Sequence, residues 1–177
     1  WSGIPNIVQD SSDLVFIDTE DVIANDSTII DLTVKHLQKN TMVSQFIFSY
    51  LNSIDEYGHK YGFSIQSPEY IQMIEHVDIM LSELLQIAQS NHWSIIITTD
   101  HGGTTYNDLT DELKKQFSKL GNVQSQIDKQ SKGIHGLPIP QHKRVFQLYY
   151  GPNYKTKEIT EQHISTDIYK HIMGIFN

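Results

Sequence analysis

Three short runs of β-branched and aromatic residues constrain the fold of this chain more than any other feature. They occupy residues 45–51, 93–99 and 145–150, and amphipathic segments separate them. Each run is nearly continuous in hydrophobicity, as expected of a strand covered on both faces. Alternating strands and helices are typical of an α/β fold. We expect a three-layer sandwich with helices on both faces of a mainly parallel sheet.

Helix signals occur in four segments between and around these runs. The pattern predicts helices over residues 28–39, 68–88, 108–120 and 166–175. Asp26 and Ser27 offer an N-cap to the first helix, and Pro68 at the start of the second follows the capping residue Ser67. Residues 1–27 read as a surface segment with at most one short strand, over 14–17, and residues 121–133 read as a loop.

Composition excludes several classes of protein. The 177 residues are enough for one domain with its own core. The chain has no cysteine, which removes disulfides, zinc ribbons and thiol nucleophiles. Thirteen basic against 21 acidic residues give a net charge of -8, which disfavours nucleic acid as a partner. No apolar run approaches the roughly 18 residues of a membrane span.

Acidic and histidine side chains gather after the predicted strands, where ligands of such sheets collect. Asp55 and His59 follow the first run and are four residues apart, so one helical turn puts both on the same side. Alone, this spacing is more typical of a surface Asp–His pair in a turn than of a shared ion.

The second run ends at Asp100-His101-Gly102-Gly103. Neighbouring residues of a strand point to opposite faces, so a shared ion requires a turn, and the two glycines supply the freedom for it. The alternative is an aspartate that caps a turn beside an exposed histidine. His135 lies between glycines before the third run, where a solvated loop histidine is the alternative.

Together these positions form a set of oxygen and imidazole ligands without thiolate: Asp55, His59, Asp100, His101 and His135. Such a set suits zinc, or manganese if carboxylates dominate, and two-metal sites are common in phosphoryl transfer. The remaining histidines have no ligand partner at a useful spacing, and we expect surface or interior packing roles for His36, His76, His92, His142, His163 and His171. Asn25-Asp26-Ser27 is a glycosylation sequon, relevant only in a secreted protein.

These motifs also carry a resemblance to a known family. The pattern resembles the C-terminal part of the alkaline phosphatase superfamily, and within it the nucleotide pyrophosphatase and type I phosphodiesterase group. The resemblance covers residues 45–176, and the first 44 residues only weakly. Its motifs are Asp55-x-x-Gly58-His59-x-x-Gly62, Thr99-Asp100-His101-Gly102-Gly103, and His135-Gly136 followed by Tyr150-Gly151-Pro152.

The resemblance implies hydrolysis of phosphoric esters, with a small phosphate ester or nucleotide as substrate. Asp55, His59 and His135 would hold one zinc, and Asp100 and His101 would supply part of a second site. In the family a Thr or Ser hydroxyl attacks phosphorus in line, and that nucleophile and a further aspartate precede the segments seen here.

On this interpretation, residues 1–177 are the C-terminal part of a larger catalytic domain, with residues 104–134 inserted near the site. We expect this chain to be inactive alone and to need the upstream remainder of the domain as its partner. Two alternatives stay open: a phosphoethanolamine-type transferase with the same metal core, and a non-catalytic interaction or structural module that retains the fold. The resemblance slightly favours an extracellular or secretory compartment.

Overall fold

The computed structural model describes residues 15, 17, 19–39, 46–119, 131–152, 154 and 167–176. Within these residues three helices precede the first strand, and short strands and helices follow in mixed order, so a mixed α/β structure is confirmed. The elements in chain order are α1 (Val22–Leu37), α2 (Ser53–Tyr61), α3 (Pro68–Ser90), β1 (Ile95–Thr98), β2 (Thr104–Thr105), the 3-10 helix η3 (Tyr106–Asp108), α4 (Asp111–Phe117), β3 (Gly133–Ile134), α6 (Pro140–Lys143), β4 (Gln147–Tyr150) and α7 (Asp167–Phe176).

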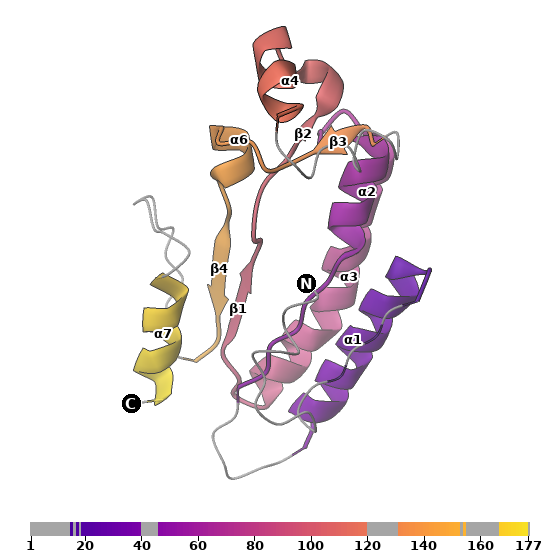
Figure 1. The fold of residues 1–177 in the computed structure, drawn as a ribbon. Coiled ribbons are helices and arrows are strands. Elements are labelled where there is room, and N and C mark those ends of the chain that lie inside the picture. The colour runs from indigo at the N-terminus through magenta and orange to yellow at the C-terminus, as the bar shows by residue number, and fades with distance from the viewer. Residues whose placement is uncertain are drawn as a thin grey trace.

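The main core lies where α1 and α3 pack together (Figure 1). Its buried residues come from these two helices and recur at helical spacing: Ile30, Val34, Leu37, Leu84 and Ala88. Ile95 of β1 and Trp93 before it pack against this cluster, which joins the sheet to the helices. The apolar stripes that predicted the first two helices therefore form the interface that supports β1.

The described strands pair antiparallel, in contrast to the mainly parallel sheet that we expected. In one two-stranded sheet Ile95 of β1 faces Tyr150 of β4, and in the other Thr104 of β2 faces Ile134 of β3. A parallel pair needs a crossover that returns the chain to the starting edge of the sheet. After β1 the chain instead continues to β2 and β3 and comes back along β4, so the directions oppose (Figure 1).

The run over residues 45–51 was expected to be a central strand, and this expectation is wrong for residues 46–51. These residues form no strand in the structure, although Ile47 and Leu51 pack against the main core. Phe46 and Phe48 point the other way and are 60% and 61% exposed. The hydrophobicity of this run correctly indicated that part of it is buried. It could not indicate whether a neighbouring strand is present to form hydrogen bonds with it.

Helix α1 begins earlier than the sequence predicted, which places Asn25 and Asp26 inside the helix. Asp21 is the N-cap, and its side chain accepts hydrogen bonds from the backbone N–H groups of Ile23 and Ala24. Asn25 is buried and bonded to Thr19, so the sequon asparagine is inaccessible to a glycan in this structure. The expectation of a surface segment up to residue 27 is therefore wrong for its last residues; residues 1–14 lie outside the described chain.

A second, smaller core forms between β3 and α4, at the end of the molecule where α2 also lies (Figure 1). It contains Leu109, Phe117, Ile134 and Leu137. The helix expected over residues 108–120 is shorter in the structure: α4 covers Asp111–Phe117, and Asp108 instead ends η3. It is not merely a solvated face, because Phe117 is only 1% exposed. Helix α6 was not predicted. Most of the expected loop, residues 121–130, lies outside the described residues.

The long helix α3 and the final helix α7 confirm two predictions closely. Pro68 stands at the first turn of α3 as expected, although the Ser67 hydroxyl makes no capping hydrogen bond. In the described part of the chain, no helix is both long and apolar enough to cross a membrane.

Candidate metal centre

Helix α2 carries two of the predicted ligands and is held in place from α1. Asp26, only 1% exposed, reaches the start of α2 and accepts hydrogen bonds from the backbone N–H groups of Asn52 and Ser53, both at 2.9 Å. A carboxylate at a helix N-terminus is stabilised by the unpaired N–H groups and by the helix dipole. This contact fixes the helix from which Asp55 and His59 project.

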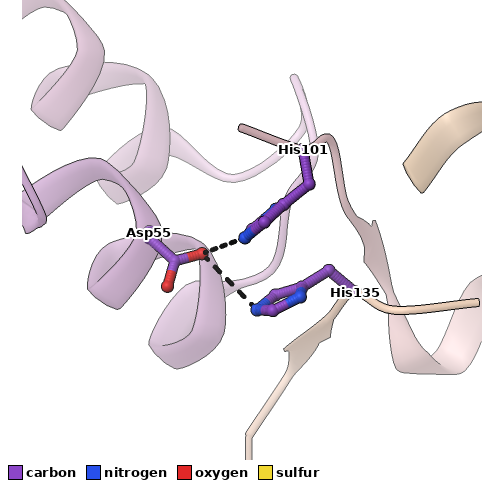
Figure 2. A group of neighbouring side chains, drawn as sticks. All are labelled: Asp55, His101 and His135. Carbon is purple, nitrogen blue, oxygen red and sulfur yellow. Dashed lines mark ion pairs between the residues drawn. The ribbon is translucent and has the colours of Figure 1, made fainter. Parts of the chain in front are cut away.

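Three histidines surround the carboxylate of Asp55. The His59 Nε2 atom lies 3.5 Å from Oδ2 of Asp55. The Nε2 atoms of His101 and His135 lie 3.9 and 3.8 Å from Oδ1 (Figure 2). Asp55, His101 and His135 form a group whose ligand atoms all lie within 4.8 Å of one another and could hold a metal ion. Residues from α2, from the loop after β1 and from the end of β3 thus meet at one point.

The imidazole rings contact one another as well as the carboxylate. The Nε2 atoms of His59 and His135 are 3.1 Å apart, and the rings of His101 and His135 stack with centroids 3.7 Å apart. Asp100 lies at the edge of the group, with Oδ1 3.7 Å from Nε2 of His101. The structure therefore brings all five predicted residues together, with Asp100 at the edge of the group.

The outer nitrogens of two of these histidines orient the rings. Nδ1 of His59 lies 2.9 Å from the carbonyl oxygen of Gly133, and Nδ1 of His101 lies 3.1 Å from that of Gly102. Because a carbonyl only accepts, each neutral imidazole carries its proton on Nδ1 and turns an unprotonated Nε2 toward Asp55. Histidines that bind metals are held by the same kind of outer hydrogen bond.

Burial makes this group electrostatically unfavourable without a cation. Desolvation raises the pKa of Asp55, although His59 and His101 oppose the shift. Desolvation, followed by the charges of His101 and His59, lowers the pKa of His135 to about 4. Oδ1 of Asp55 is buried and has no hydrogen-bond partner among the described residues. A cation among these atoms would satisfy the unpaired oxygen and the unprotonated nitrogens at once, so the residues present fit a metal.

The glycines beside the ligands permit close packing, and this corrects their predicted role. Gly102 and Gly103 are not among the residues with positive φ, so no left-handed turn requires them. A Cβ atom at Gly58, Gly103 or Gly133 would instead collide with the ring of Phe63, and one at Gly102 with backbone of α6. The three segments that carry the ligands can approach one another only because these positions lack a side chain.

Sequence reasoning separated the ligands into two subsites, whereas the structure forms one continuous cluster in which His101 stacks on His135. It also missed three supporting residues: Asp26, Phe63 and His142. Asp26 could have been suspected as an acidic residue within an apolar helical stretch. Phe63 and His142 carry no sequence signal, because their roles depend on segments distant in the chain.

Comparison with known proteins identifies the family of this chain. The family model for type I phosphodiesterase/nucleotide pyrophosphatase matches residues 6–168. Ectonucleotide pyrophosphatase/phosphodiesterase family member 7 of Mus musculus is 31% identical over 106 residues, covering 56% of this chain and 24% of the mouse protein. The match thus spans about a quarter of that relative. No solved structure matches significantly. The match over most of the chain shows that this protein belongs to the type I phosphodiesterase/nucleotide pyrophosphatase family.

Proposed function

We propose that this protein takes part in metal-dependent hydrolysis of phosphoric esters, with a nucleotide or another small phosphate ester as substrate. The observation that carries the proposal is the convergence of three Nε2 atoms on the Asp55 carboxylate. Nitrogen and oxygen donors without sulfur suit zinc, with manganese as the second choice. When bound, such ions stabilise charge on the phosphoryl oxygens and activate the attacking oxygen.

The ligands divide most simply between two ions. We assign Asp55, His59 and His135 to one, which leaves it an open position for substrate, and Asp100 and His101 to the other. The contact of His101 with Asp55 brings the two ligand sets side by side, as two neighbouring ions would require. This chain's contribution is to hold these donors, through the outer hydrogen bonds of His59 and His101.

We further propose that the nucleophilic hydroxyl and the remaining ligand come from an upstream part of a larger catalytic domain. The second ion has two ligands here, one fewer than a catalytic zinc ion commonly has. The hydroxyl of Thr98 donates to the carbonyl of Phe146 at 2.8 Å, so it is already engaged. The exposed rings of Phe46 and Phe48 offer an apolar surface on which further chain could pack.

Metal binding by the purified chain tests this proposal. Titration with Zn²⁺ in competition with a chromophoric chelator should show tight binding that His135→Asn weakens at least tenfold, because one ligand is lost. His76→Asn is the matched control, since His76 is exposed on α3. Wild-type protein that binds no zinc, or binding that survives His135→Asn unchanged, would reject the metal centre.

Catalysis requires a separate assay. The chain alone should not hydrolyse bis(p-nitrophenyl) phosphate, whereas a chain extended by its upstream coding sequence should do so in a metal-dependent manner. Product formed only when an alcohol acceptor is added would favour a transferase. An extended, zinc-loaded chain that is inactive with and without acceptor would favour a non-catalytic module.

We also propose an extracellular or secretory location, supported only by the name of the mouse relative, an ectonucleotide pyrophosphatase. Fractionation of cells that express the full-length protein would test this location. Recovery of the protein in the cytosol alone would contradict it.

A further inference from the structure

His142 is buried beside the metal centre, although its sequence position gave no reason to expect a role there. It lies in α6 and is only 4% exposed. Burial lowers the pKa of His142, and the charge of His101 adds to this shift. The hydrogen bonds of His142 reach both loops that carry the stacked histidines.

The side chain of His142 binds the loop that carries His135. Its Nδ1 atom accepts a hydrogen bond from the backbone N–H of Leu137 at 3.0 Å. Leu137 lies two residues beyond His135, and Gly136 between them has a φ of 96°, a left-handed conformation that favours glycine. The imidazole therefore anchors the chain directly after an unusual turn, which sets the direction in which His135 points.

The backbone of His142 binds the loop that carries His101. Its carbonyl oxygen accepts a hydrogen bond from the N–H of Gly102 at 3.0 Å. The contact is close enough that a Cβ atom at Gly102 would collide with the carbonyl oxygen of Gln141. One residue of α6 thus holds both loops, one through its side chain and one through its main chain.

Packing alone does not account for a histidine at this position. Because Nδ1 accepts from Leu137, the proton of the neutral imidazole is on Nε2. This Nε2 atom is buried and has no hydrogen-bond partner in the described part of the chain, which lowers stability. A leucine would fill similar space without an unpaired donor. The bond from Leu137 is the interaction that an apolar residue could not make.

We propose that His142 is a positioning residue that fixes His135 against His101, so that both Nε2 atoms face Asp55. The inference rests on the proposed function, because it concerns a metal centre. It assigns to His142 no contact with substrate or metal. Loss of its side-chain hydrogen bond should loosen the His135 loop while leaving every ligand in the chain.

Three substitutions separate the hydrogen bond from packing. His142→Leu keeps bulk and removes the acceptor. His142→Asn places an amide oxygen near the position of Nδ1, and His142→Gln places its amide one atom further out, near Nε2. The Asn and Gln variants carry the same amide group, so a difference in zinc affinity between them reports the Leu137 hydrogen bond. This comparison tests the inference even if the Leu variant fails to fold.

Zinc affinity by chelator competition is the first readout, and the visible spectrum of the cobalt-substituted protein is the second. We expect His142→Leu and His142→Gln to raise the Kd for zinc about 10–100-fold and to alter the cobalt spectrum, as loss of an outer support typically does. His142→Asn should stay near wild type. Equal affinities and spectra in all four proteins, or equal losses in all three variants, would overturn the inference. A wild-type protein without zinc affinity would instead reject the proposed function, and this inference with it.

Discussion

At the level of single residues, burial of Asp55 and His135 determines how stable the metal-free site is. Asp55 exposes little of its carboxylate, and one of its oxygens has no hydrogen-bond partner among the described residues. His135 is held neutral by burial and by neighbouring imidazoles. Both features lower the free energy of unfolding of the metal-free protein. A bound cation would offset this cost, because it would neutralise the carboxylate and bind the imidazole nitrogens.

Acid should destabilise the metal-free protein through His135. Its pKa is about 4 in the folded state against about 6.5 when unfolded, so between these values only the unfolded chain binds the proton. Stability should therefore fall as the pH drops from 6.5 to 4, by on the order of 1–2 kcal/mol after allowing for solvent screening. Urea unfolding in the presence of a metal chelator at several pH values measures this dependence of the free energy of unfolding on pH. Replacing His135 by Asn should flatten the dependence; an unchanged slope would contradict the assignment.

Removal of the Asp26 carboxylate should loosen α2. Asp26→Ala leaves the N–H groups of Asn52 and Ser53 unpaired, and we expect a loss of roughly 2–4 kcal/mol in the free energy of unfolding. Asp31→Ala is the control on the same helix, because Asp31 is exposed, and should change stability by less than about 0.5 kcal/mol. Similar effects of the two substitutions in urea unfolding would show that Asp26 does not anchor α2.

At the level of elements, periodicity predicted helices well because an apolar stripe is a local property. The buried residues of α3 run from Met73 to Ala88, and the sequence predicted this helix together with its proline start. Strand pairing was not predictable, since β1 and β4 are separated by about 50 residues of intervening structure. The ligands themselves were found because each lies beside its own short motif. The residues that support them were missed because their contacts are long-range.

Because the segments that carry the ligands pack closely, we expect a side chain at position 103 to destabilise the protein. Gly103→Ala should cost about 1–3 kcal/mol, because its Cβ would meet the Phe63 ring. The cost should shrink in a Phe63→Leu background, which a double-mutant cycle in urea detects. Gly174→Ala in α7 is the control: no atom of the described residues lies within 4 Å of its Cβ position, and we expect a gain of about 0.5–1 kcal/mol. Absence of coupling between positions 63 and 103 would contradict this packing.

At the level of the whole molecule, the metal centre joins three parts of the chain that also contact one another, through Phe63 and the glycines around it. Asp55 belongs to the helical layer, His101 follows β1, and His135 follows β3 beside the second core. Cations held by these residues would link the three regions, in the way that a ligand specific to the folded state stabilises it by mass action. The site is therefore expected to contribute to folding as well as to chemistry.

Zinc should raise the melting temperature of the protein. At a free concentration of 100 times the Kd, binding adds about 2.7 kcal/mol, which corresponds to roughly 5–10 °C for a chain of this size. Differential scanning calorimetry in zinc and in chelator measures the shift. A protein with both Asp55→Asn and His135→Asn should show none, and an equal shift in that variant would place the stabilising metal elsewhere.

The central claim is that Asp55, His59 and His135 hold one divalent cation, with His101 beside it. Crystals of the protein grown with zinc and measured on both sides of the zinc absorption edge test it most directly. We predict an anomalous difference peak within coordination distance of Asp55 and at least two of the Nε2 atoms, about 2.0–2.2 Å from each. Zinc peaks found only at other sites, with these side chains still clustered and unliganded, would contradict the account.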